Sequence, residues 1–520
     1  MELCDQYLHE CIKIDPTMND YFKFKEYEHL RHIQPNFYSD EYEGKFKKLV
    51  NKYFKILEKK DCKNTYDKVL ERSLKYSIEY YKFKIYYYMP ISSQNNFFYN
   101  ICDEIKGDFY FRIDTKNDIE IYIKRLKKLD EMTNTIIDKF KQGIKNKVTM
   151  YYKNIDIIIH TFQEILKNES YVFKKNIPLK NKLNDTINEY YVKNLNKLLT
   201  FLITDYYPHT SKKLGLCQYK GGKKLYCILI KDKLMDCATP ENIQEFGKIE
   251  LKRLLKEKNK LVKNDEGKFK KKNYEYKSEK EILKRLEVIR GNLYKNNSKY
   301  FNENLKESEN YLIKKIPEEI KSVAYYYPSD FNREKKGTFY INTNYIGYDI
   351  NSLVTLSLHE GMPGHHYQLE RLLKDKDIPD YIKYNGCDSY IEGWGLYSEN
   401  LYDYKKDIEK YHKLRYEILR AARLIIDTGI HYFGWDYEKC KKFITKNTSN
   451  KEIHEILRYN SMPGQALTYK MGEKVILFLR DKYLEKDKNG LKDFNELILK
   501  QGPIPLDLLI SEIKKNINKL

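Results

Sequence analysis

The sequence lacks the long hydrophobic segments that membrane insertion and secretion require. Its 520 residues include no uninterrupted apolar run of about 18, so we expect no transmembrane helix. The first residues, MELCDQYLHECIKIDP, contain no apolar core, so we expect no secretory signal. Both absences favour a cytoplasmic protein.

Cysteine is present, but it follows no pattern that would pair or cluster it. The nine cysteines are scattered from Cys4 to Cys440, their number is odd, and no CxxC motif occurs. We therefore predict reduced thiols in a cytoplasm-like compartment and do not expect cysteine among the metal ligands.

Positive charge is in excess, with 96 Lys and Arg against 75 Asp and Glu and a formal net charge of +21. Such an excess is typical of nucleic-acid binding. The lysines, however, are spread along the whole chain and interleaved with acidic residues, and no nucleic-acid-binding motif stands out. We therefore do not expect nucleic acid as the main partner, and interpret the Lys-rich segment 252–280 as a solvated surface insertion.

Three of the eleven histidines lie close together in residues 349–371, DINSLVTLSLHEGMPGHHYQLER. His359 is followed directly by Glu360, and His365 and His366 come shortly after. Imidazole and carboxylate groups without thiols suit a divalent metal such as zinc. The apolar spacing at the start of this stretch predicts a helix that carries the first histidine and the glutamate in its third turn.

Proline interrupts the spacing of the usual metallopeptidase motif, HExxH. In that motif the two histidines are four residues apart on one helical face, but here Pro363 stands four residues after His359. Proline breaks or bulges a helix, and Gly364 permits an unusual backbone after it. We interpret the stretch as HExxH with a two-residue insertion, which makes His365 the second ligand. His366 is the alternative ligand, and otherwise is expected to contact substrate.

A third ligand is expected from the segment YIEGWGLYSE. Glu392 and Glu399 are seven residues apart, so they share one face if the segment is helical. We predict that Glu392 binds the metal and that Glu399 holds a ligating imidazole in place or contacts substrate. An ordinary amphipathic helix with two exposed glutamates is the structural alternative.

The stretches HEGMPGHHYQ and EGWGLYSE together resemble the DUF885 family. This largely uncharacterised family is similar to zinc metallopeptidases of the gluzincin type. Residues 118–126, 214–226, 420–431 and 459–472 also match its pattern, so the resemblance covers roughly residues 90–515. It implies one Zn²⁺ per chain and the general fold, and is less informative about substrate.

The resemblance also implies functional roles for residues whose position alone favours structural ones. Tyr469 and His431 are expected to act in catalysis, with the Tyr469 hydroxyl directed at the developing oxyanion. Arg423 and Gln465 are expected to contact substrate. Asp427 is expected to hold a metal-bound imidazole, with a pairing to Arg423 as the alternative, and His431 can equally be a buried histidine with satisfied hydrogen bonds.

The predicted fold is mainly α-helical with a small antiparallel β-sheet, as a large zincin-like metallopeptidase with a deep substrate cleft. We predict an N-terminal helical segment at residues 1–90. Residues 91–320 are expected to form a helical cleft wall with a Gly-rich hairpin near 214–237. Residues 321–520 are expected to form the catalytic part.

A strand is expected at residues 337–343, GTFYINT, shortly before the histidine motif. In zincin-type enzymes an edge strand at this place pairs with the peptide substrate, and Tyr340 is then a substrate contact. The alternative is an ordinary core strand.

These predictions together describe a zinc-dependent peptidase acting on short or unfolded peptides. Glu360 is expected to assist the attack of metal-activated water as general base and then to protonate the leaving amine. Two alternatives remain: a non-catalytic helical binding protein on the same scaffold, and a metal hydrolase of non-peptide amides or esters. The sequence does not distinguish internal from terminal cleavage, and predicts no oligomeric state.

Overall fold

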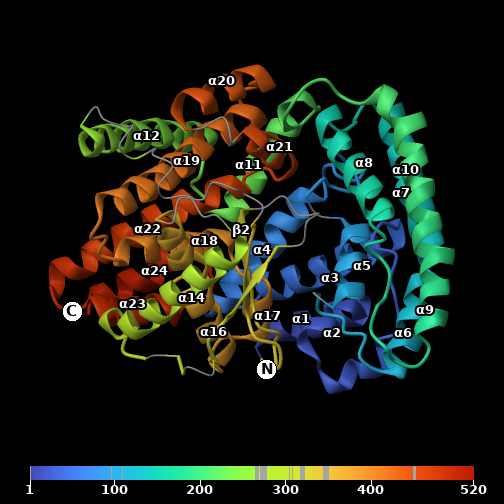
Figure 1. Ribbon diagram of the computed structural model, residues 1–520, viewed down its shortest axis with the longest axis horizontal. Helices are drawn as coiled ribbons and strands as arrows, with labels where there is room; N and C mark the ends of the chain where they lie inside the picture. Colours follow the sequence, from blue (N-terminus) through green and yellow to red (C-terminus); the bar gives the residue numbers. More distant parts are fainter. Residues whose placement is uncertain are drawn as a thin grey trace. The chain divides into compact units, whose positions relative to one another are not determined.

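The computed structural model shows a mainly helical chain (Figure 1). The residues that the structure describes are 2–94, 96–107, 109–263, 269, 278–303, 305–306, 309–316, 323–343, 351–448 and 453–519. Part of the predicted Lys-rich insertion, residues 264–268 and 270–277, lies outside this set. None of the described helices combines the length and the apolar composition that a bilayer crossing requires.

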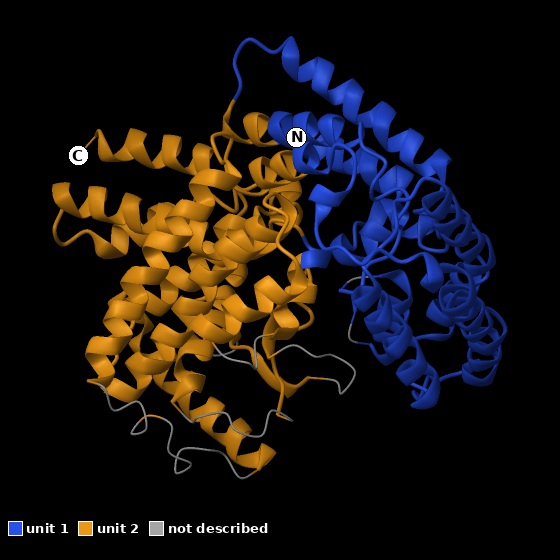
Figure 2. Cartoon of the chain, turned by 90° about the horizontal axis from the view of Figure 1, so that it is seen from above, with its two compact units in different colours: residues 1–63, 70–225, 460–462 blue, residues 64–69, 226–459, 463–520 orange. Residues whose placement is uncertain are grey.

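The chain divides into two compact units, shown in different colours in Figure 2. Unit 1 contains residues 1–63, 70–225 and 460–462, and unit 2 contains 64–69, 226–459 and 463–520. The domain boundary predicted after residue 90 lies inside unit 1, and the one predicted after residue 320 lies inside unit 2. The longest segments of the two units meet after residue 225 instead. A boundary between the two units falls inside three helices, α4 (Thr65–Tyr80), α11 (Gly222–Lys233) and α21 (Glu455–Ser461).

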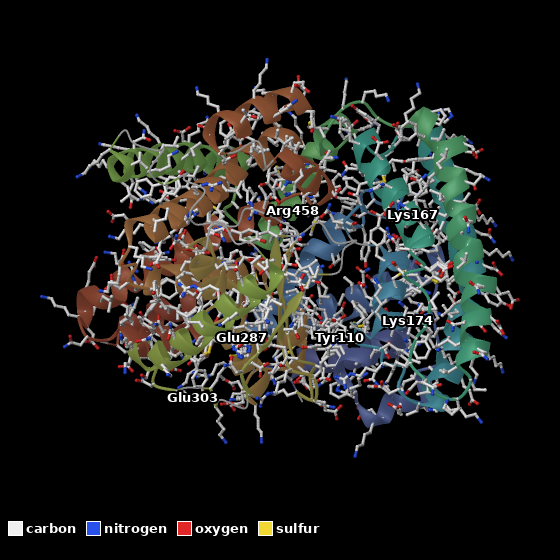
Figure 3. All side chains as sticks on the ribbon, viewed as in Figure 1. Tyr110, Lys167, Lys174, Glu287, Glu303 and Arg458 are labelled. Carbon is white, nitrogen blue, oxygen red and sulfur yellow. The ribbon has the colours of Figure 1, made fainter. Side chains whose placement is uncertain are left out.

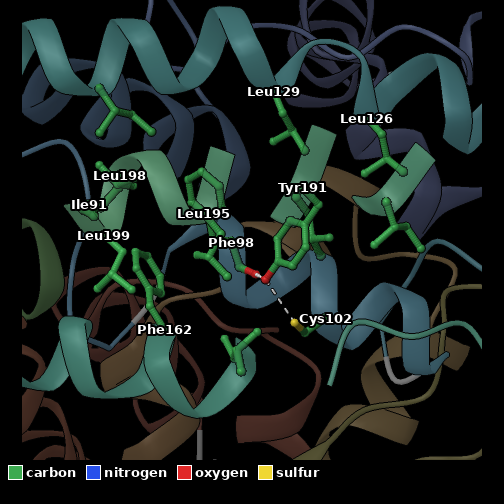
Figure 4. Packing of buried hydrophobic residues seen from close by; sticks show 14 of the residues in the cluster. Ile91, Phe98, Cys102, Leu126, Leu129, Phe162, Tyr191, Leu195, Leu198 and Leu199 are labelled. Carbon is green, nitrogen blue, oxygen red and sulfur yellow. Dashed lines mark hydrogen bonds between the residues drawn. The ribbon is translucent and has the colours of Figure 1, made fainter. Parts of the chain in front are cut away.

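The N-terminal half of the chain is helical, as predicted, and its core is formed by aromatic and aliphatic side chains of unit 1. In Figure 4, Tyr191 lies among Phe98, Leu195 and Leu129, and its hydroxyl donates to the Phe98 carbonyl at 2.8 Å. The helices of this half are α1 (Leu3–Ile14), α2 (Asn19–Phe22), α3 (Asp40–Glu58), α4 (Thr65–Tyr80), α5 (Phe97–Lys106), α6 (Lys116–Leu126), α7 (Leu129–Lys145), α8 (Tyr152–Lys167), α9 (Lys180–Thr186) and α10 (Lys193–Phe201).

Unit 2 is built around long helices that pack closely at glycines. Gly247 lies where an added Cβ would be 2.8 Å from Leu424, so the two helices that carry these residues approach each other closely. Thr239 caps the first of them, with Pro240 in its first turn. The helices of this part are α11 (Gly222–Lys233), α12 (Pro240–Val262), α14 (Glu279–Asn296), α15 (Ser352–Glu360), α16 (His365–Lys374), α17 (Asp380–Tyr384), α18 (Asp388–Leu401), α19 (Asp407–His431), α20 (Tyr437–Asn447), α21 (Glu455–Ser461), α22 (Gln465–Lys486), α23 (Leu491–Leu499) and α24 (Leu506–Ile517).

The predicted β-sheet exists, but its topology differs from the prediction. Strands β1 (Leu312–Lys315), β2 (Ala324–Tyr327) and β3 (Thr338–Ile341) form a sheet of order β1-β3-β2. Strand β3 pairs with β1 in parallel and with β2 in antiparallel orientation, so the sheet is mixed rather than antiparallel. Since β3 is the central strand, the prediction of an edge strand at 337–343 is wrong.

The predicted Gly-rich hairpin near 214–237 is also wrong, because this segment is helical. A short 3₁₀ turn at Leu216–Gln218 leads into α11. The run LYCILI has strand-like composition, but the buried residues Tyr226, Ile230 and Leu234 recur every four positions, which is helical spacing. Gly222 is required at the start of the helix, because an added Cβ would lie 1.7 Å from the Leu216 carbonyl oxygen.

Candidate metal centre

The predicted break in the histidine motif is present between α15 and α16. His359 lies in the last turn of α15, and His365 is the first residue of α16. At Gly364 an added Cβ would lie 2.0 Å from the His359 carbonyl oxygen and 2.3 Å from that of Leu358. Only glycine therefore fits where the chain folds back to begin the second helix.

Helix α18 supports this turn through two side chains of the EGWGLYSE segment. Trp394 donates from Nε1 to the Pro363 carbonyl at 2.9 Å, and Ser398 donates from Oγ to the Leu358 carbonyl at 3.0 Å. Both carbonyls lose their usual helical partners where the helix is interrupted, and buried carbonyls require a replacement. The two motifs of the sequence therefore form one structural unit.

His359, His365 and Glu392 converge on one point. Each offers a ligand atom, and the three atoms lie within 4.8 Å of one another. The Glu392 Oε2 atom is 3.5 Å from His359 Nε2 and 3.4 Å from His365 Nε2. The two imidazole rings are nearly perpendicular, with centroids 4.7 Å apart.

The donor set fits a zinc ion. Glu392 Oε2 is buried and has no hydrogen-bond partner, which is costly for a carboxylate unless a cation satisfies it. Zinc ligands at about 2.0–2.2 Å in tetrahedral geometry lie about 3.4 Å apart, which matches the two Glu392–histidine distances. Two imidazoles and one carboxylate also form a common catalytic zinc set.

Glu399 orients the first histidine. It is fully buried, and its Oε1 is 2.9 Å from His359 Nδ1, which leaves Nε2 directed at the cluster. Arg420 donates to the same oxygen at 3.0 Å. Burial lowers the pKa of His359, but the nearby carboxylates of Glu392 and Glu399 raise it more, to about 9. The structure thus brings together both predicted glutamates on one face of α18.

Two glycines of the EGWG segment allow α18 to approach its neighbours. At Gly395 an added Cβ would lie 2.6 Å from His359 Cε1. At Gly393 it would lie 2.5 Å from the backbone of Gly472 on α22 (Figure 1). Glycine at these positions therefore brings the carboxylates of α18 within reach of the imidazole.

Glu360 is available for proton transfer next to the cluster. Its side chain follows His359 directly, is 8% exposed, and forms no hydrogen bond or ion pair with a described residue. An uncommitted carboxylate beside a candidate metal site can accept and return a proton.

Tyr469 on α22 lies against the cluster. Its ring is nearly parallel to that of His359, with centroids 6.3 Å apart, and Arg423 Cζ lies 4.6 Å from its centre. Gln465 donates from Nε2 to its hydroxyl at 3.4 Å. Burial and the charge of Glu392 raise the pKa of Tyr469 to about 12, so the hydroxyl stays protonated at neutral pH.

His366 is turned away from the cluster, so it is not the alternative ligand. Its Nδ1 is 2.9 Å from the Tyr326 hydroxyl on β2, and its ring packs edge-on against Tyr311. It is fully buried, and burial together with the charge of Arg290 lowers its pKa to about 3. His365 and His366 are consecutive residues of α16, so their side chains leave the helix about 100° apart and only one of them faces the cluster.

Asp427 and His431 have partners other than the metal cluster. Asp427 accepts from the Tyr226 hydroxyl at 2.6 Å and from the Gly464 amide at 3.0 Å, so it does not hold a cluster imidazole as predicted. His431 is fully buried, lies 3.0 Å from the Tyr459 carbonyl, and stacks on Tyr226. This is the satisfied buried histidine of the structural alternative, and its pKa falls to about 4 because of burial.

Tyr340 also lies away from a substrate position. It is 5% exposed on the central strand, and its ring stacks on Tyr325 with centroids 5.0 Å apart. Both edges of its strand are already paired, so a peptide cannot add there.

A protein-family model described as "Bacterial protein of unknown function (DUF885)" matches residues 31–513 of the chain. The chain belongs to the DUF885 family. No curated protein matches it.

Two solved structures show the same fold as this DUF885 chain. A candidate lipoprotein from Colwellia psychrerythraea has a TM-score of 0.89 at 21% identity, with 100% of this chain and 98% of that one covered. A candidate lipoprotein of unknown function from Shewanella oneidensis has a TM-score of 0.73 at 14% identity, with 98% of both chains covered. These likenesses establish the fold alone.

Several residues around the centre of this DUF885 chain are not predictable from the sequence as parts of a site. Trp394 and Ser398 stand in a motif that does not reveal their contacts. Nothing in the sequence singles out Arg458, which donates to Gln465 at 2.7 Å. A side chain that contacts a distant turn or a distant carboxylate leaves no pattern in the sequence around it. For Arg420, only the helical spacing from Arg423 indicates a shared side.

Proposed function

We propose that this DUF885 chain is a zinc-dependent peptidase that hydrolyses peptide bonds of short or unfolded peptides. The observation that carries the proposal is the buried, unpartnered Oε2 atom of Glu392, positioned 3.4–3.5 Å from two imidazole nitrogens. A zincin-like catalytic unit of gluzincin type, with a deep substrate cleft, is part of the same proposal.

His359, His365 and Glu392 would hold the ion. When bound, zinc supplies Lewis acidity and lowers the pKa of water to near 7. Glu360 accepts the proton of the attacking water and delivers it to the leaving amine. Its lack of other partners among the described residues supports this role.

Tyr469 provides the hydrogen bond to the oxygen of the scissile carbonyl as negative charge develops there. Its parallel packing on His359 and its protonated hydroxyl support this role. Glu399 and Arg420 keep His359 in the orientation that presents Nε2.

A cytoplasmic location is a further part of the proposal. None of the nine cysteines, all of which the structure describes, forms a disulfide, which suits a reducing compartment. The description of the two similar structures as candidate lipoproteins favours an exported location instead, and fractionation of the source cells distinguishes the two.

The test compares wild type, Glu360→Gln and Glu438→Gln, the last being a matched change at an exposed glutamate. Wild type and both variants should bind about one zinc per chain, and only Glu360→Gln should lose cleavage of a peptide library. Zinc content far below one per chain, without cleavage after zinc addition, would favour a binding protein. Cleavage of ester substrates but not of peptides would favour a hydrolase of another class.

A further inference from the structure

Two arginines share one carboxylate beside the candidate metal centre. Arg423 on α19 and Arg458 on α21, which is labelled in Figure 3, both donate to Glu455, at 3.1 and 2.9 Å. Two guanidinium groups on one carboxylate leave a net positive charge at this place. The nearby Asp427 does not offset it by contact, because its oxygens are bound to Tyr226 and Gly464.

This arginine pair is close to the reaction centre. The Tyr469 ring lies 6.3 Å from the ring of His359 and 4.6 Å from the guanidinium carbon of Arg423. The guanidinium is therefore at most about 11 Å from a metal ligand, a distance that about three extended residues span. Gln465 links the arginine pair to Tyr469, since it accepts a hydrogen bond from Arg458 and donates one to the Tyr469 hydroxyl.

The pair retains hydrogen-bonding capacity. Arg423 donates from Nε to the Tyr459 hydroxyl and from Nη2 to Glu455, whereas its Nη1 group has no partner among the described residues. The side chains of Arg423 and Arg458 are 12% and 20% exposed, so solvent reaches them only in part. A guanidinium group with a free donor, partly desolvated, binds a planar carboxylate well.

We propose that Arg423 and Arg458 form a subsite for the C-terminal carboxylate of the peptide substrate. This inference rests on the proposed peptidase function for the identity of the ligand. The distance to the metal ligands places the scissile bond within three residues of the C-terminus. The enzyme is then a carboxypeptidase that releases one to three residues.

The binding test uses the full-length, zinc-loaded Glu360→Gln variant, which does not turn substrate over. Calorimetry compares an N-acetylated alanine pentapeptide as free acid with its C-terminal amide. The acid should bind about 10- to 100-fold more tightly, as expected for hydrogen bonds to a charged group. Adding Arg423→Gln or Arg458→Gln should reduce the affinity for the acid to that for the amide. Adding Arg480→Gln, a partly exposed arginine on α22, should change neither.

Equal binding of acid and amide, no binding of either, or an equal loss for both peptides in the arginine variants would overturn the subsite. If circular dichroism shows that one arginine variant does not fold, the affinities of the other arginine variant for acid and amide decide whether the subsite exists. Cleavage by wild type separates this inference from the proposed function. Equal cleavage of acid and amide removes the subsite but keeps the peptidase, whereas acid-selective binding without cleavage keeps the subsite and removes the peptidase.

Discussion

Replacement of Glu399 tests whether a buried carboxylate outside the ligand set controls the affinity of the metal centre. Glu399 is fully buried, and its Oε1 contacts both His359 Nδ1 and Arg420 Nη2. Its Oε2 has no partner, so glutamine can keep both hydrogen bonds and place its amide nitrogen where Oε2 lies. Glu399→Gln therefore removes the charge with little change of shape, whereas Glu399→Ala removes charge and bonds together.

The expected effects are graded. Loss of a carboxylate partner of a ligating histidine typically lowers metal affinity about 10- to 100-fold. We expect Glu399→Gln at the lower end, about tenfold, because the ring of His359 stays oriented, and Glu399→Ala near 100-fold. The alanine variant also leaves Arg420 buried without a counter-charge, which should lower the free energy of unfolding of the metal-free protein by about 3–5 kcal/mol.

Zinc affinity is measured by competition with a chromophoric chelator, and stability by urea unfolding of the metal-free protein. Glu438→Gln is the control, since that side chain is exposed on α20. Wild-type zinc affinity in both Glu399 variants would refute the positioning role. Complete loss of zinc in Glu399→Gln would instead indicate that Glu399 is itself a ligand.

Three further predictions concern neighbouring positions. His365→Gln should abolish stoichiometric zinc binding, whereas His366→Gln should retain it, because only the first imidazole faces the cluster. Gly395→Ala should lower the free energy of unfolding by about 1–3 kcal/mol and weaken zinc binding, because its Cβ would overlap the ligand ring at 2.6 Å. Burial raises the pKa of Asp427 from 3.8 to about 7, so the folded state keeps a proton that the unfolded chain loses. Stability should therefore fall as pH rises from about 4 to 7, by up to about 4 kcal/mol for this group, and Asp427→Asn should remove that part of the slope.

Each of these three predictions has a control variant or an outcome that would contradict it. Gly291→Ala, at a helical glycine with open space around the added Cβ, should not destabilise; a loss equal to that of Gly395→Ala would point to a general effect of the substitution. Zinc loss in His366→Gln with retention in His365→Gln would reverse the ligand assignment. Parallel stability–pH curves for wild type and Asp427→Asn between pH 4 and 7 would show that Asp427 does not titrate there.

The part of the centre that could be predicted is the part with local periodicity. Glu392 and Glu399 share a face because they are seven residues apart in one helix, and both contact His359. The helix break was predictable because proline and glycine act on their own backbone. The direction of the chain after the break was not, so His365 and His366 could be ranked but not separated. Their orientation depends on Tyr326 and other partners far along the chain.

The errors in the fold have the same origin. Strand order depends on pairing between distant segments, so β3 could be recognised as a strand but not as the central one. The LYCILI run has strand-like composition, yet tertiary contacts influence the structure of a segment more than its β propensity does. Within unit 2, Tyr226 from this run donates to Asp427 and stacks on His431. These contacts also account for Asp427, which was expected to hold a metal-bound imidazole, and for His431, which was expected to act in catalysis.

Helix α18 explains how an interrupted motif can still bring three candidate metal ligands together. In an unbroken HExxH helix, the helix itself aligns the two histidines. Here α18 aligns them instead, because Trp394 and Ser398 bind the carbonyls left by the break and Gly395 admits the His359 ring. The same helix supplies Glu392 to both imidazoles. The two-residue insertion and the EGWGLYSE segment therefore depend on each other, so a restored HExxH spacing in this chain should lose the geometry rather than improve it.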